Sequence, residues 1–152
     1  MHIVIGSDHA GFHLKGPLVQ ALMEWGHDVE DVGGYTAAEV DFPDIATRLC
    51  DAIRAGRAER GVMVCGTGIG ACMAANRVPG IRAALAHDVH SAHQCVEHDH
   101  ANVLCLGAGI VGEWLARDLL RAYLDALPSQ EAHFLRRVAK LAAMERGGSE
   151  SR

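Results

Sequence analysis

The segment VMVCGTGIGACMAANR, residues 62–77, combines a thiol with three closely spaced glycines. Cys65 ends a short apolar run, the glycines follow it, and a helix-like run comes next. Glycines let consecutive backbone N–H groups converge at the start of a helix, where they stabilise an anion. A thiol in such surroundings is expected to have a lowered pKa and to act as a base or nucleophile. The segment therefore predicts a site where Cys65 removes a proton and backbone amides carry the resulting negative charge.

The rest of the chain alternates short β-branched runs with helical stretches, which predicts βαβ units and a parallel sheet. Five strands are expected, over residues 2–7, 27–33, 61–65, 80–86 and 102–107. Six helices are expected, over residues 11–26, 41–56, 69–77, 88–98, 112–127 and 131–146. The prediction is one three-layer, Rossmann-like α/β domain at 1–146, with helices on both faces of a five-stranded parallel sheet, and a flexible tail at 147–152.

Polar and titratable residues cluster where the predicted strands end. Ligands of such sheets bind beyond the carboxyl ends of the strands. In this chain those ends carry Ser7-Asp8-His9, Gly33-Gly34, Cys65-Gly66-Thr67, His87-Asp88 and Gly107-Ala108-Gly109. The functional site is therefore expected at this edge of the sheet.

Composition and charge exclude several classes of protein. A length of 152 residues suits one domain, and 49% apolar residues allow a sizeable core. A net charge of −5 without a basic run argues against nucleic-acid binding. No apolar run reaches the roughly 18 residues of a membrane span, and the N-terminus lacks the features of a signal peptide, so a cytoplasmic location is expected. Five cysteines at irregular spacing without a CxxC pair make a poor disulfide framework.

Two glycine patterns, GTGIGA at 66–71 and GAGIVG at 107–112, are similar to dinucleotide-binding fingerprints. They follow the third and fifth predicted strands, whereas that fingerprint normally occupies the first βα turn of its unit. For residues 107–112 we favour a tight turn with close helix–sheet packing. A nicotinamide-binding oxidoreductase remains the alternative from another functional class.

A histidine-rich stretch contains His90, His93, Cys95, His98 and His100. His90 and His93 could share one face of a helix, as metal ligands do, but Cys95 points elsewhere on the same helix. We favour a partly packed, partly solvated helix here, and we expect no metal and no cofactor.

Five segments together resemble the ribose-5-phosphate isomerase type B family, which includes the galactose-6-phosphate isomerase subunits and allose-6-phosphate isomerase. They are GSDHAGFHLK, DFPDIA at 41–46, CGTGIGACMAANRVPGIRAAL at 65–85, NVLCLG at 102–107 and RRVAK at 136–140. Their order and spacing hold over nearly the whole chain. The resemblance implies a metal-independent aldose–ketose isomerase that works through a cis-enediolate, with D-ribose 5-phosphate and D-ribulose 5-phosphate as the expected pair.

The resemblance also implies roles for the residues around the thiol. Cys65 is the base that moves the proton between C1 and C2. One branch of the family instead uses a glutamate at the position of Ala71, so this chain is expected to use the thiol. Thr67 orients the base and binds substrate. The oxyanion site is formed by the backbone amides of Gly66, Gly68, Ile69 and Gly70.

Further roles implied by the resemblance concern ring opening and the phosphate. His98 is the acid/base that opens the sugar ring, helped by Asp8. His9 and Arg137 hold the phosphate. The family is dimeric, and each active site is completed by the neighbouring subunit. The helix at 131–146 is therefore expected to pack on a partner subunit, in a homodimer or a dimer of dimers.

Three parts of the sequence depart from the family pattern. The arginine of a GSR sequence before the helix at 112–127 is Gly109 here. In the C-terminal pattern GGRHxxRV the first arginine becomes His133 and the next histidine becomes Phe134. The asparagine that often follows the ring-opening histidine becomes Asp99, which we keep as a substrate-binding position.

These departures predict an intact proton-transfer site and an altered set of residues that bind the phosphate. Arg137 and His9 remain, and either His133 or Arg136 is a candidate for a further phosphate contact. A neutral histidine cannot replace the bidentate, permanently charged arginine. Isomerases of tetrose 4-phosphate, allose 6-phosphate, galactose 6-phosphate or an unphosphorylated sugar remain alternatives, as does a catalytically silent sugar-phosphate-binding subunit.

Overall fold

The computed structural model describes the backbone of residues 1–147 and the side chains of residues 1–145. Its strands are β1 (His2–Ser7), β2 (Asp28–Asp31), β3 (Arg60–Cys65), β4 (Ala83–Leu85) and β5 (Val103–Gly107). Its helices are α1 (Phe12–Glu24), α2 (Phe42–Arg54), α3 (Ile69–Ala75), α4 (Val89–Asp99), α5 (Glu113–Asp125) and α6 (Ala132–Gly147). All elements expected from the sequence are present. Most of the predicted tail, residues 148–152, lies outside the described part of the chain.

All five strands are parallel, in the order β2-β1-β3-β5-β4. Two predicted strands are shorter than expected by more than one residue, and both are edge strands, which have a neighbour on one side only. β2 stops at Asp31 because Gly33 and Gly34 have φ angles of 137° and 66°, outside the range of a strand. β4 is confined to residues 83–85, after a glycine at position 80 with a φ of 83°.

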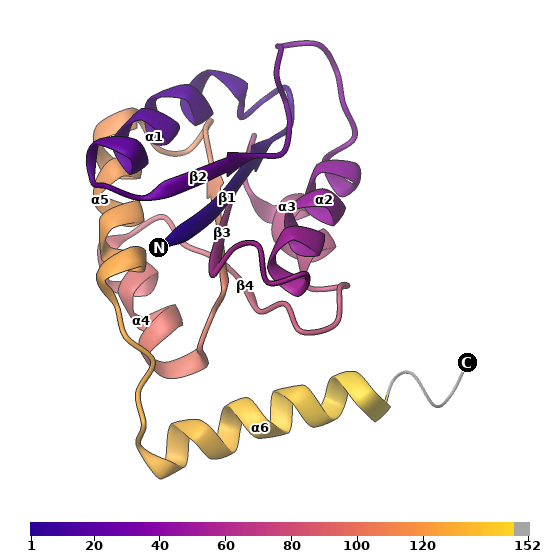
Figure 1. Cartoon of the computed structure of the whole chain (residues 1–152), viewed down its shortest axis with the longest axis vertical. Coiled ribbons are helices and arrows are strands. Elements are labelled where there is room, and N and C mark those ends of the chain that lie inside the picture. Colours follow the sequence, from indigo (N-terminus) through magenta and orange to yellow (C-terminus); the bar gives the residue numbers. More distant parts are fainter. Residues whose placement is uncertain (148–152) are drawn as a thin grey trace.

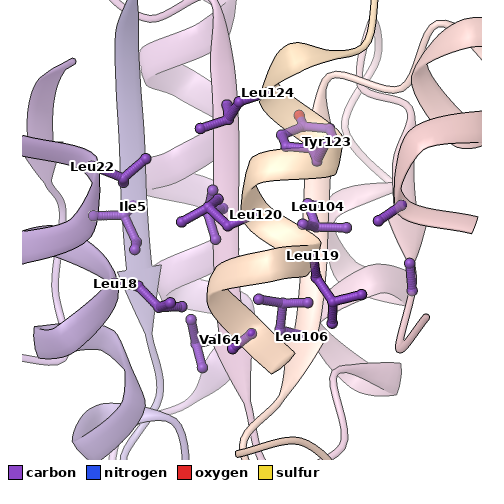
Figure 2. Packing of buried hydrophobic residues seen from close by; sticks show 14 of the residues in the cluster. Ile5, Leu18, Leu22, Val64, Leu104, Leu106, Leu119, Leu120, Tyr123 and Leu124 are labelled. Atoms are coloured by element: carbon purple, nitrogen blue, oxygen red, sulfur yellow. The ribbon is translucent and has the colours of Figure 1, made fainter. Parts of the chain in front are cut away.

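Helices cover both faces of the sheet, which confirms the predicted three-layer α/β fold. α1, α4 and α5 pack on one face and α2 and α3 on the other (Figure 1). Alternate strand residues supply the two cores, as the pleat of a strand requires. On the first face, Ile5, Val64 and Leu104 meet leucines of α1 and α5 (Figure 2). Cys65 belongs to the second face, which it shares with α2 and α3.

The last helix stands apart from the body of the domain. In Figure 1, α6 extends beyond one end of the sheet, and its packing within the chain is against α4. Arg60 fixes the end of α5 before the turn, since its guanidinium donates hydrogen bonds to the carbonyls of Tyr123, Leu124 and Ala126. No helix within residues 1–147 is long and apolar enough to span a membrane.

A buried ion pair holds the loop after β2 against the end of β1. Lys15, only 3% exposed, donates to both carboxylate oxygens of Asp31 at 2.7 Å and to the carbonyl of Gly33 at 2.8 Å. The next residue, Gly34, packs so tightly that a Cβ there would lie 2.1 Å from the carbonyl oxygen of Ser7. Lys15 thus supports the backbone just before Asp8.

We expect Lys15→Met to lower the free energy of unfolding by about 3 kcal/mol, because Asp31 and the Gly33 carbonyl lose their partner. The figure is at the low end for a broken buried pair, since the Asp31 side chain is 33% exposed and can rehydrate. Urea denaturation measures the change. Arg57→Met is the matched control: it breaks an exposed pair with Glu30, and we expect less than about 1 kcal/mol. Equal losses in the two variants would contradict the assigned role of Lys15.

Candidate active site

The ends of β1 and β3 bring Asp8 and Cys65 side by side. The two strands are paired up to Ser7 and Val64, and the Asp8 N–H continues the ladder to the carbonyl of Val64 at 3.2 Å. The Cys65 thiol donates a hydrogen bond to Asp8 Oδ2, with 2.8 Å between sulfur and oxygen. The other carboxylate oxygen accepts the backbone N–H of Gly11 at 2.9 Å, just before α1 begins. Two of the four predicted catalytic residues therefore touch.

The pKa of Cys65 is raised, and this corrects the expectation of a lowered one. Burial is the largest cause, followed by the hydrogen bond to Asp8 and by the charge of that carboxylate. Hydrogen bonds from the backbone of Gly68 and Gly66 act in the lowering direction, as the glycine loop predicted, but they do not prevail. Cys65 is 8% exposed and Asp8 is 4% exposed, so water screens their interaction poorly. The resting thiol is therefore protonated at neutral pH.

The glycine loop after Cys65 is held by the loop after β5. Ala108 donates its N–H to the carbonyl of Cys65 at 2.8 Å, and Gly109 donates to the carbonyl of Gly66 at 2.9 Å. The two loops lie so close that a Cβ on Gly107 would be 2.7 Å from the carbonyl of Thr67. This close approach explains the glycines of residues 107–112 by backbone packing. It agrees with the packing interpretation of that pattern.

Gly68 sets the direction of the loop as α3 begins. Its φ of 77° is left-handed, and a Cβ there would lie 2.6 Å from a methyl group of Leu85. Thr67 is exposed, and its hydroxyl accepts the N–H of Ile69 at 3.4 Å. The predicted amide donors of Gly66, Gly68, Ile69 and Gly70 thus lie in one short turn directly after the thiol.

His9 lies at the same edge of the sheet as Asp8 and is exposed. Its Nδ1 accepts the backbone N–H of Val40 at 3.4 Å. This contact leaves Nε2 as the protonated nitrogen of the neutral ring, available to donate to a ligand. Gly109, at the position of an expected arginine, is also exposed at this edge. A Cβ there would lie 3.0 Å from the carbonyl oxygen of Gly66, so a larger side chain would press on the thiol loop.

The remaining predicted residues form a second group. The rings of His98 and Phe134 stack with 4.0 Å between centroids and 17° between planes. The ring of His133 lies 3.9 Å from that of Phe134, and the Arg137 guanidinium lies 5.7 Å from the same ring. Gln94 lies 3.0 Å from Nδ1 of His98 and fixes the orientation of its ring. α4 and α6 thus bring three half-buried aromatic rings together beside the exposed guanidinium of Arg137.

The topology places this cluster at the opposite edge of the sheet from Cys65. α4 begins after the carboxyl end of β4 and runs back toward the start of β5, so His98 in its last turn lies at the amino ends of the strands. The first turns of α6 pack there as well (Figure 1). Within one chain, the structure therefore brings Asp8, His9, Cys65 and Thr67 together and leaves His98, His133 and Arg137 apart from them.

A hollow of about 360 Å³ lies between α6 and the β4–α4 side of the domain. Asp99 lines it, together with Arg82, Leu141 and Glu145, whereas the thiol loop at 65–70 does not. Asp99 is therefore near the His98 cluster and far from Cys65. Among the described residues, the hollow marks a surface of α6 that no other part of the domain covers.

Sequence reasoning missed two contacts in these groups. The hydrogen bond between Cys65 and Asp8 was not predicted, although both residues were, because it depends on β1 being the neighbour of β3. The stack of Phe134 on His98 was not predicted either. Its signal is the replacement of a family histidine by phenylalanine, which turns a hydrogen-bonding ring into an apolar one.

Comparison with known proteins gives consistent matches over almost the whole chain. The family model described as Ribose/Galactose Isomerase matches residues 3–141. D-erythrulose-4-phosphate isomerase of Pectobacterium atrosepticum is 41% identical over 127 residues, covering 83% of this chain and 84% of that protein.

Two solved structures share both the fold and more than a third of the aligned sequence with this chain. Ribose-5-phosphate isomerase B of Clostridium thermocellum superimposes with a TM-score of 0.94 at 39% identity, covering 97% of this chain and 99% of that one. Ribose-5-phosphate isomerase B of Mycoplasma genitalium, solved with bound ribulose-5-phosphate, gives a TM-score of 0.88 at 35% identity, covering 95% and 96%.

Proposed function

The chain belongs to the ribose/galactose isomerase family of sugar-phosphate aldose–ketose isomerases, and from this premise we propose that it interconverts D-ribose 5-phosphate and D-ribulose 5-phosphate without a metal. The observation that carries the proposal is the pair of Cys65 and Asp8 beside the glycine loop. It supplies a proton acceptor next to backbone amides that can stabilise an enediolate.

The reaction divides among the residues as follows. His98 opens the sugar ring, Cys65 takes the C2 proton and returns it to C1, and Thr67 positions the substrate. The amides of the loop at 66–70 carry the charge of the enediolate. His9 and Arg137 bind the phosphate, and a charged arginine can give it two parallel hydrogen bonds.

The active site is shared between two copies of the chain in this proposal. His98 and Arg137 lie at the opposite edge of the sheet from Cys65, so a complete site needs the His98 cluster of a second copy. α6 supports this arrangement, because it exposes the apolar side chains of Leu135, Leu141 and Met144. Large apolar side chains exposed together on one helix are typical of a surface that another chain covers.

A four-carbon substrate, D-erythrulose 4-phosphate, is the second candidate. The relative from Pectobacterium atrosepticum that carries this activity in its name is 41% identical, against 39% for the Clostridium thermocellum ribose-5-phosphate isomerase B. Phe134 and Gly109 replace a histidine and an arginine of the family pattern, both of which can form hydrogen bonds. Their loss also favours a substrate whose phosphate is bound by a different set of residues.

A panel of four-, five- and six-carbon sugars, each with and without phosphate, tests the proposal on the purified chain alone in the presence of a chelator. We expect the highest kcat/KM with D-ribose 5-phosphate and no effect of the chelator. A higher kcat/KM with D-erythrulose 4-phosphate would select the second candidate. Failure to turn over any sugar phosphate would reject both and favour a silent subunit, and binding of NAD(H) would favour the oxidoreductase.

A further inference from the structure

The contact between Cys65 and Asp8 raises a problem for proton transfer. A thiol must be deprotonated before it can take a proton from C2. Yet its hydrogen already points at Asp8 Oδ2, 2.8 Å from the sulfur, and both residues are buried. Loss of the proton to water would leave two neighbouring negative charges in a place of low exposure, which is unfavourable.

We propose that Asp8 stores the proton of Cys65 during the isomerisation, so that the pair acts as one base with a constant charge of minus one. This inference rests on the proposed function and gives Asp8 a task separate from ring opening. Because Asp8 acts through the thiol, it is a positioning and proton-storing residue in this step.

Each proton transfer in this step breaks one bond and forms another. The S–H bond of Cys65 breaks as an O–H bond forms at Asp8 Oδ2. The thiolate then takes the C2 proton, which forms S–H again and leaves the enediolate. In the enediolate the proton of the O2 hydroxyl passes to O1. The same S–H then gives its proton to C1, and the proton stored on Asp8 returns to the sulfur. No oxidant, reductant or further reactant takes part.

The surroundings of the pair suit both positions of the proton. When the charge is on Asp8, the Gly11 N–H at 2.9 Å stabilises it. When the charge is on sulfur, the hydrogen bonds from the backbone of Gly68 and Gly66 stabilise it. A further thiol close by is Cys105 on β5, which is buried and whose pKa is raised by its hydrogen bond with Cys72 and by burial, so it stays neutral.

The proposal predicts a mismatch between two pH profiles of the wild type. Ionisation of Cys65 is measured as the ultraviolet thiolate absorbance of the wild type minus that of Cys65→Ala. The kcat for the preferred sugar phosphate is measured over the same pH range. We expect kcat to reach a plateau well below the pH at which the thiol ionises, because a single proton shared within the pair makes the base without help from solution.

Asp8→Asn provides the second test. The amide can still accept from Gly11 and can donate to the sulfur, so we expect the Cys65 ionisation to move to lower pH. The acid limb of kcat should then coincide with that ionisation, and the plateau should fall about tenfold or more, since a thiolate of lower pKa is a weaker base. Asp88→Asn is the matched control, because Asp88 is an exposed carboxylate at the same edge that bonds Ser91, and both profiles should stay unchanged.

Two results would overturn the proposal. One is a wild-type kcat that keeps rising until the thiol ionises, a result for which Cys65→Ala serves only as the spectroscopic reference. The other is an Asp8→Asn enzyme whose thiol ionises at the wild-type pH. Thiol ionisation is measured without substrate, so lack of turnover in the wild type would reject the proposed isomerase function separately from the hydrogen bond.

Discussion

Replacing Cys65 by alanine is expected to reduce kcat for the preferred sugar phosphate by about 10³-fold or more, the usual size of a lost general base. Alanine removes the sulfur to which we assign the exchange of the proton between C1 and C2. It leaves in place the backbone amides of residues 66–70 and the proposed ligands of the phosphate. Substrate affinity, measured by calorimetry, should therefore change little while turnover is lost.

The control for this variant is Cys72→Ala, seven residues further along the same segment. Cys72 is half-buried, its hydrogen bond goes to the carbonyl of Ala83, and its pKa is lowered to about 7 mainly by its hydrogen bond with Cys105. It is thus the more acidic of the two thiols, and a site chosen by acidity alone would favour it. We expect Cys72→Ala to retain wild-type kcat. A Cys65→Ala enzyme within tenfold of wild type would reject the role of the thiol.

The elements of the fold could be predicted because their periodicity is local. Buried parallel strands read as short β-branched runs, and every predicted strand and helix exists within a few residues of its expected bounds. The order β2-β1-β3-β5-β4 was not predicted, since it depends on packing between segments far apart in the sequence. The contact of Asp8 with Cys65 follows from that order.

The pKa of Cys65 shows why local patterns alone misjudge a site. The glycine loop was expected to lower it, and its amides do act in that direction. The larger causes are burial and the Asp8 carboxylate, and neither is visible in the segment at 62–77. The sequence therefore predicted a thiol that the fold places beside the glycine loop and Asp8, but gave the wrong direction for the shift of its pKa.

Sequence resemblance also predicted residues without predicting where they lie. His98 and Cys65 are 33 positions apart in the sequence. Cys65 is the last residue of strand β3, and His98 lies in the last turn of helix α4. A strand that ends at one edge must be followed by a helix that returns to the other, so the two residues lie at opposite edges. This geometry turns the expected dimer from a general family property into a requirement of this proposed mechanism.

Mixing two inactive variants is therefore expected to restore activity. Cys65→Ala lacks the proposed base and His98→Ala lacks the proposed ring-opening group, so each homodimer is expected to have two defective sites. A mixed dimer has one site that lacks both groups and one site in which both are intact. With random exchange of subunits, half of the dimers are mixed, and about a quarter of the wild-type activity should return.

The recovery is measured by combining equal amounts of the two variants, allowing subunits to exchange, and assaying the preferred sugar phosphate. Cys65→Ala mixed with the double variant Cys65→Ala/His98→Ala is the control, because no combination of these chains builds an intact site. If Cys65 and His98 instead served the same chain's site, the mixture would stay as inactive as its parts. Recovery in the mixture but not in the control would therefore establish that the two edges of the sheet belong to one active site across a subunit interface.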